Sequence, residues 1–178
     1  MSYLQMTTGQ YREVLNHLLG AESEEVVFLF TSLQDRGSSR SFDCKEIYKV
    51  PPSGFERQSA YHICLSDRTR QQIIKHASDT QTCLVEAHSH LNNLSPVEFS
   101  ASDMIGFEEF VPHVRWRLGG RPYIALVYNK TSFDALVWEN ENNTMRSLQA
   151  IEVGKHRIFP TNLSLKRLRK ESGSYEPR

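Results

Sequence analysis

Apolar and polar residues follow two different periods along the chain, and each period predicts a type of element. Apolar residues at helical spacing predict helices. They are one capped by Thr7 or Thr8 that ends at Gly20, one capped by Ser66 or Asp67 that runs to about Ala77, one from near Ser100 that ends before Pro112, and a short C-terminal one carrying Leu163, Leu165 and Leu168. Short apolar or alternating runs predict strands. These are residues 26–30, 42–50, 61–65, 82–87, 123–128, 133–139 and 145–153, with an exposed loop at 34–41 and a hairpin turn at 129–132.

The order of these elements predicts an α/β protein. The strand at 61–65, the helix after Ser66 and the strand at 82–87 read as a crossover unit, which favours α/β layering over a helical bundle. The continuous apolar run at 26–30 suits a strand covered on both faces. No linker divides the chain, so we expect one domain over residues 1–178, with a core at about 7–160 and a basic C-terminal tail at 161–178.

Composition narrows the classes of partner. The chain has 21 Lys and Arg against 21 Asp and Glu, so no overall charge favours nucleic acid or a membrane surface. No apolar run is long enough for a membrane helix, and no signal peptide is evident, so we expect a soluble, cytoplasmic protein. Three cysteines without paired metal spacing suggest a reducing compartment. Cys83, inside an apolar strand, is better explained as a core residue than as a nucleophile.

Residues 84–103 carry the pattern with the clearest chemistry. His88 and His90 follow a strand and lie two residues apart, so their imidazoles can face one point. Ser100 and Asp103 are i and i+3 in the first turn of the next helix. Two imidazoles, one carboxylate and an open fourth position are typical of a catalytic zinc site. Taken singly, the histidines also suit a polar surface, and Ser-x-x-Asp suits a helix capping box.

The pattern as a whole resembles the JAMM, or MPN-type, zinc metalloproteases. That family has a glutamate on an early strand, then His-x-His, then Ser-x-x-Asp at a helix start; the matching residues here are Glu25, His88, His90, Ser100 and Asp103. The layout is similar from about residue 11 to about residue 154, and most similar to the compact bacterial members. The resemblance implies the JAB/MPN fold, which is cytidine-deaminase-like, with a mixed central β-sheet flanked by helices.

The chain departs from the family pattern in the loop after the second histidine. Leu91 stands where the family usually has a proline, and the loop at 91–99 is two residues longer than usual. A loop can absorb two residues at little entropic cost. Glu98 is a conceivable substitute for Asp103 as a ligand. Glu24 is the neighbouring alternative to Glu25, although on a strand it points the other way.

The resemblance implies a function and its partners. One zinc ion would be held by His88, His90 and Asp103, with Glu25 as general base and Ser100 as oxyanion donor. The implied reaction cleaves the bond after the C-terminal glycine of a ubiquitin-like protein, in deconjugation or precursor processing. The implied partners are that protein and its conjugates, with E1- or E2-like enzymes of the bacterial pathways, antiviral ones among them, in which the compact members occur. The alternative is a non-catalytic MPN scaffold.

Overall fold

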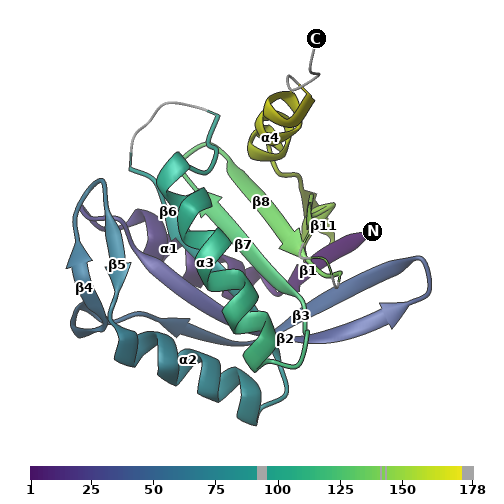
Figure 1. The fold of residues 1–178 in the computed structure, drawn as a ribbon, viewed down its shortest axis with the longest axis horizontal. Helices are drawn as coiled ribbons and strands as arrows, with labels where there is room; N and C mark the ends of the chain where they lie inside the picture. The colour runs from purple at the N-terminus through teal and green to yellow at the C-terminus, as the bar shows by residue number, and fades with distance from the viewer. Residues whose placement is uncertain (92–95, 141, 143, 174–178) are drawn as a thin grey trace.

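The protein folds around one large mixed sheet, as a computed structural model shows for residues 1–91, 96–140, 142 and 144–173. Within these residues the sheet has nine strands in the order β11-β10-β1-β3-β2-β6-β7-β8-β9 (Figure 1). Their bounds are β1 Ser2–Met6, β2 Val26–Arg36, β3 Ser39–Lys49, β6 Cys83–Ser89, β7 Tyr123–Tyr128, β8 Phe133–Trp138, β9 Met145–Arg146, β10 Ala150–Val153 and β11 His156–Ile158. A separate two-stranded sheet pairs β4 Phe55–Gln58 with β5 Ile63–Leu65.

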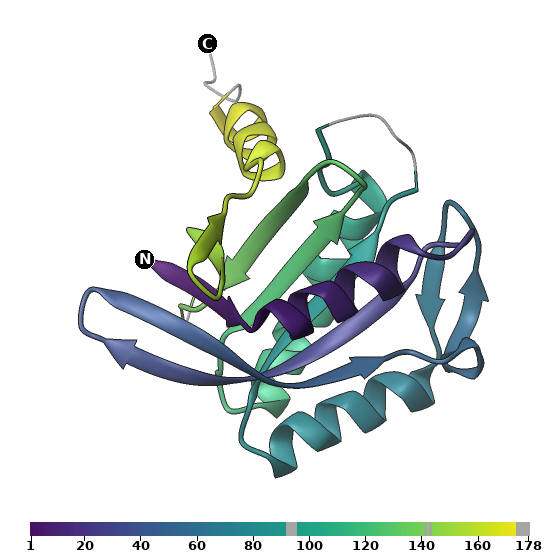
Figure 2. The same ribbon diagram turned by 180° about the vertical axis from the view of Figure 1, so that it is seen from behind.

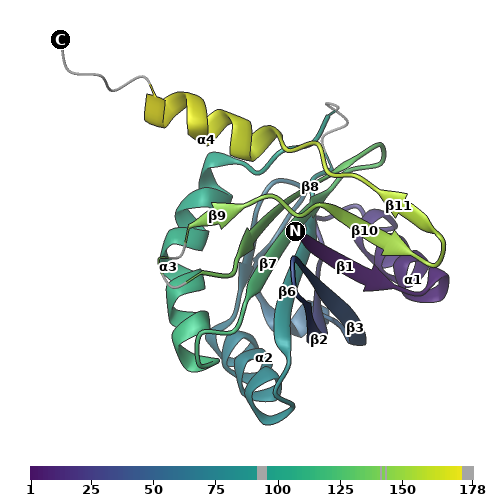
Figure 3. The ribbon, with the colours of Figure 1, turned by 90° about the vertical axis from the view of Figure 1, so that its right-hand side faces the viewer.

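Helices cover both faces of the large sheet. They are α1 Thr8–Leu19, α2 Asp67–Asp79, α3 Ala101–Arg117 and α4 Leu163–Gly173, with a 3-10 turn at Pro52–Gly54. Seen from the opposite sides, α2 and α3 lie on one face and α1 on the other (Figures 1 and 2). Viewed along the sheet, α4 lies beyond β8 near the start of α3 (Figure 3). None of the helices described here has the length and apolar character needed to cross a membrane.

The central strands are apolar on both sides because each face has its own core. Val26, Phe28 and Phe30 of β2 belong to the core under α2 and α3. Val27 and Leu29 belong to the core under α1. Successive side chains of a strand point to opposite faces, so a continuous apolar run is the expected pattern for a strand buried on both. The prediction of an α/β protein with such a strand at 26–30 is confirmed.

The crossover lies in a different place from the one predicted. β5 pairs with β4 in the small sheet, so β5, α2 and β6 do not form a crossover within one sheet. A crossover through one helix between parallel neighbours is found instead at β6 and β7, which are joined by α3. This arrangement places the start of α3 after the carboxyl end of β6.

Several other elements differ from the sequence prediction. β1, β4 and β11 were missed, and the loop predicted at 34–41 is the end of a β2–β3 hairpin turned by Gly37 at φ 72°. The strand predicted at 145–153 is two strands, β9 and β10. Helix α3 continues through Pro112 to Arg117 because Val111 and Val114, on either side, are buried against the sheet. Such burial offsets the lost hydrogen bond of an interior proline.

Candidate metal centre

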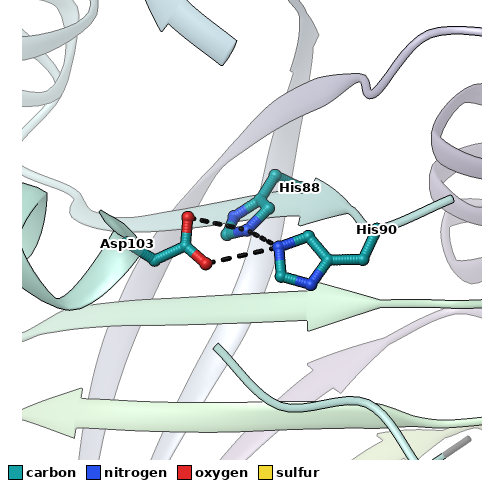
Figure 4. Close-up of side chains that lie close together, drawn as sticks. All are labelled: His88, His90 and Asp103. Atoms are coloured by element: carbon teal, nitrogen blue, oxygen red, sulfur yellow. Dashed lines mark hydrogen bonds and ion pairs between the residues drawn. The ribbon is translucent and has the colours of Figure 1, made fainter. Parts of the chain in front are cut away.

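Three predicted ligands meet above the end of β6. His88 Nε2 lies 3.3 Å from His90 Nε2 and 3.5 Å from Asp103 Oδ1, and His90 Nε2 lies 3.3 Å from Asp103 Oδ2 (Figure 4). One donor atom from each residue lies within 4.8 Å of the others. Nitrogen and oxygen ligands about 2.0–2.1 Å from a tetrahedral zinc stand about 3.3 Å apart. The three residues therefore have the donor types and spacing that a single zinc ion requires.

The strand period explains why both histidines face the same point. His88 is opposite Val26 in the antiparallel ladder with β2, and beside Val127 in the parallel ladder with β7. The backbone N–H of His90 donates to the carbonyl of Tyr128 at 2.7 Å, so extended pairing with β7 continues past the end of β6. Residues two apart in such a ladder share a face. Both imidazoles therefore project toward α3.

Ser100 and Asp103 form a helix capping box and, at the same time, present a ligand. Ser100 Oγ accepts from the Asp103 N–H at 3.1 Å, while Asp103 Oδ2 accepts from the Ser100 N–H at 2.7 Å and from Ser100 Oγ at 2.8 Å. The cap fixes the rotamer of Asp103, and the same carboxylate reaches both histidines. From the sequence, helix capping and metal binding were alternative interpretations of Ser-x-x-Asp. In the structure the Asp103 side chain can do both.

Opposed charges couple the triad. Burial alone would raise the pKa of Asp103, but hydrogen bonds with His88 and His90, the charge of His88 and the Ser100 hydrogen bond outweigh it and hold that pKa well below its usual range. Burial would lower the pKa of His88, but the hydrogen bond and charge of Asp103, helped by Glu86 and Glu24, raise it. A carboxylate that stays ionised beside two imidazoles is suited to binding a cation.

The segment that leads into Ser100 is held by α4. The N–H of Phe99 donates to Ser164 Oγ at 2.9 Å, and Arg167 Nη2 donates to the Phe99 carbonyl at 2.7 Å. The carboxylate of Asp134 accepts from the N–H groups of Asn162 and Ser164, which anchors the start of α4 to β8. The helix predicted in the tail thus holds the backbone four residues ahead of Asp103.

Glu24, and not Glu25, faces the triad. Glu24 lines the cavity that contains both histidines and Asp103, and its carboxylate is buried. Burial raises the pKa of Glu24, His90 and His88 lower it, and Asp103 raises it. Glu25 lies 3.5 Å from His17 Nε2, and its Oε1 accepts from Ser23 Oγ, on the α1 face of the sheet.

The expected placement of the two glutamates is therefore reversed. Glu25 exchanges hydrogen bonds with Ser89: its N–H donates to Ser89 Oγ and its carbonyl accepts from the Ser89 N–H. It is thus paired with the residue between the histidines, and its side chain points away from them. Glu24 shares a face with Val26, which is paired with His88. The run at 26–30 is apolar on both faces of the sheet, so the sequence did not indicate which glutamate lies on the same face as His88 and His90.

A cavity of about 270 Å³ opens beside the triad. It is bounded by the β4–β5 region, the start of α2, β6 and the first three turns of α3, and it includes Ser100. Glu86, two residues before His88, lines it and accepts a hydrogen bond from Tyr123 Oη. Burial raises the pKa of Glu86, although His88 and the Tyr123 hydrogen bond lower it. Sequence analysis did not single out Glu86, yet its shared face with His88 follows from the strand period.

The other candidate residues lie elsewhere. Glu98 forms an ion pair with Arg167 Nη1 at 3.0 Å and is not part of the triad, so it does not replace Asp103. Cys83 is buried in the core under α1, and burial raises the pKa of its thiol to about 11. The loop predicted to carry two extra residues spans 91–99. Residues 92–95 of this loop lie outside the described part of the chain.

Comparisons with known proteins leave the family open. No protein-family model matches the chain, and no curated protein matches it. Among solved structures, the chain is similar to a protein from Salinibacter ruber determined in solution, with 14% identity, a TM-score of 0.46, and coverage of 90% of this chain and 96% of that one.

Proposed function

We propose that the protein is a zinc-dependent hydrolase of amide bonds, of the JAMM type and with the JAB/MPN fold that the sequence resembles. The observation that carries the proposal is the spacing of 3.3–3.5 Å among His88, His90 and Asp103. Glu24 and Ser100 line the same cavity as this triad. A structural zinc site would be expected to close its fourth position with a further protein ligand. Among the described residues, the metal-ligand cluster contains only the three.

The chemistry divides between the ion and the chain. Held by His88, His90 and Asp103, zinc would lower the pKa of a water molecule to about 7 and so supply a nucleophile at neutral pH. Glu24 would take the proton of that water and deliver it to the leaving nitrogen, which is general acid–base work worth about 100- to 10,000-fold. The raised pKa of Glu24 favours such proton return, because the ideal catalytic pKa lies near the working pH.

Ser100 has a holding role and an oxyanion role in this proposal. In the structure its hydroxyl donates to Asp103 Oδ2 at 2.8 Å and so stabilises the ligand carboxylate. With Asp103 bound to an ion, that hydroxyl would be able to turn and donate to the oxyanion. Loss of one oxyanion donor typically costs about 3–4 kcal/mol of transition-state stabilisation.

The substrate class comes from the resemblance. We propose cleavage after the C-terminal glycine of a ubiquitin-like protein, in conjugates or in a precursor, within a cytoplasmic bacterial pathway that includes E1- or E2-like enzymes and serves antiviral defence. An extended C-terminal tail can bind along a strand edge, and the small β4–β5 sheet borders the cavity. The non-catalytic scaffold is the alternative that the experiment below separates.

Glu24→Gln and Glu25→Gln form a matched pair for this test. Both change a carboxylate to an amide in adjacent residues, but only Glu24 lines the triad cavity. We expect both variants to bind one zinc per chain, and cleavage of ubiquitin-like C-terminal amide substrates to fall at least about 100-fold only in Glu24→Gln. Asp103→Ala should lose zinc. A wild-type protein that binds no zinc supports the scaffold, and equal activity of the pair removes Glu24 from the mechanism.

A further inference from the structure

The cavity extends away from the triad along α3, toward a less polar end. Its lining on that helix passes from Asp103 through Gly106 and Phe107 to Phe110. Seven residues of α-helix rise about 10 Å. Ile63 and Leu65 of β5 also line the cavity and add to its apolar surface. A substrate group bound at the triad can therefore continue for about 10 Å between α3 and the small sheet.

One cation, Arg70 of α2, stands in this apolar part of the cavity. Arg70 lines the cavity, and its guanidinium carbon lies 5.5 Å from the centre of the Phe110 ring. The stacking on Phe110 holds the side chain in place. No carboxylate in the described residues lies within ion-pair distance of Arg70, and no hydrogen bond of its side chain is present there. Its five donors are thus available to a ligand.

The neighbouring Glu86 does not form an ion pair with Arg70. Glu86 and Arg70 influence each other electrostatically, but the hydrogen bond to the Glu86 carboxylate comes from Tyr123. A guanidinium next to apolar walls gains most from a planar anion that accepts two parallel hydrogen bonds. The chemical group of that kind in a peptide is a carboxylate. Arg70 is therefore placed to recognise an acidic group on the substrate.

We propose that Arg70 binds a carboxylate on the leaving-group side of the scissile bond, so that the preferred leaving group carries an acidic group two to three residues beyond that bond. This inference rests on the proposed hydrolase. Hydrolysis breaks the C–N bond, adds the water hydroxyl to the acyl carbon and gives the proton to the nitrogen of the segment. An extended chain spans about 3.3–3.6 Å per residue, so two to three residues cover the length of about 10 Å along α3. A cavity of about 270 Å³ admits a segment of that size.

The carboxylate has two sources, the C-terminus of the segment or an Asp or Glu side chain. The C-terminal source would make the enzyme trim two or three residues from the end of a precursor. The side-chain source would make it cut inside a chain, ahead of an acidic residue. Both kinds of carboxylate would contact Arg70 in the same way. The dipeptides that bind in the test below distinguish them.

The test measures binding of product-like dipeptides, so it requires no cleavage. Leu-Phe, Leu-Phe-amide and Leu-Glu-amide are titrated by calorimetry into the zinc-loaded and the zinc-free full chain. Charged hydrogen bonds of this type are worth about a tenfold to hundredfold difference in affinity. We expect Leu-Phe to bind at least about tenfold more tightly than Leu-Phe-amide. Binding of Leu-Glu-amide at the affinity of Leu-Phe assigns the side-chain source, and weak binding assigns the C-terminal source.

Variants tie the preference to Arg70. Arg70→Gln should bind Leu-Phe and Leu-Phe-amide equally, while Arg70→Lys, which keeps the charge without the planar fork, should retain part of the preference. Arg68→Gln, an exposed arginine two residues away on α2, is the control and should match the wild type. Equal binding of the two dipeptides by the wild type, an unchanged preference in Arg70→Gln, or no binding of any probe overturns the inference. Loss of zinc or of cleavage with the dipeptide preference intact overturns the proposed hydrolase alone.

Discussion

Replacing Arg167 by alanine tests whether α4 positions the metal ligand. Arg167 donates to the Phe99 carbonyl at 2.7 Å and pairs with Glu98 at 3.0 Å, directly ahead of the capping box at Ser100. Its side chain is 33% exposed, so solvent screens part of both interactions. A hydrogen bond from a charged donor is worth about 1.5–3 kcal/mol, and an exposed ion pair about 0–1 kcal/mol. After screening, we expect Arg167→Ala to lower the free energy of unfolding by about 1–2 kcal/mol.

The larger consequence concerns zinc. Without Arg167 the Phe99 carbonyl loses its charged donor, and the segment before Ser100 gains freedom that zinc binding must then remove. Groups that orient a metal ligand typically contribute about 10- to 100-fold to metal affinity. Arg167 contacts the backbone four positions before Asp103, so we expect a loss of about tenfold, the lower end of that range. Zinc binding stabilises the folded state by mass action, and a tenfold weaker site gives about 1.4 kcal/mol less stabilisation at saturating metal.

Urea unfolding with and without zinc, together with a competitive zinc titration, measures both effects. Arg169→Ala is the control, because Arg169 is an exposed arginine of the same helix with no contact to the 97–100 segment among the described residues. The difference between metal-bound and metal-free stability should shrink in Arg167→Ala and stay unchanged in Arg169→Ala. If Arg167→Ala loses stability but keeps the wild-type zinc affinity, α4 supports the fold without positioning Asp103.

Three further outcomes follow from the site and the core. The pKa of Asp103 is lowered in the folded protein, so without metal its ionised carboxylate stabilises the fold above the unfolded pKa of about 4, and this effect is lost as the pH falls further. The difference in unfolding free energy between wild type and Asp103→Asn should therefore shrink in acid. Urea titrations at pH 7 and pH 3 would measure it. Phe99→Ala removes a fully buried ring that packs on Phe107 at 5.2 Å, and should cost about 3–5 kcal/mol in urea unfolding, whereas the exposed Ile105→Ala should cost little. Tyr123→Phe leaves the Glu86 carboxylate without its donor and should cost about 1–3 kcal/mol; unchanged stability would show that Glu86 finds another partner.

Local patterns in the sequence determined much of the candidate site. The alternation of His88 and His90 after an apolar run was enough to predict a shared face, and Ser100 and Asp103 were placed in the first turn of a helix by their spacing. These features depend on backbone periods of two and about 3.6 residues, which a sequence displays directly. The same is true of α1 and α2, whose caps and apolar stripes lie within one element.

The choice between Glu24 and Glu25 could not be made locally. Val26 through Phe30 are apolar on both faces, so the alternation that would assign a side to each residue is missing. Only the pairing of Val26 with His88, across 62 positions of sequence, orients Glu24 toward the triad. β1 is a similar case, because its strand state depends on pairing with both β3 and β10.

The sequence by itself determined the donor set, its spacing on strand and helix, and the α/β class. The tertiary structure decided which glutamate joins the site, which helix holds the segment before Ser100, and which cation stands in the cavity beside it. Arg70, Glu86 and Arg167 come from a helix, a strand and the C-terminal helix that are far apart in the chain. Their positions around the site result from strand register and helix packing, which are long-range contacts that no local period encodes.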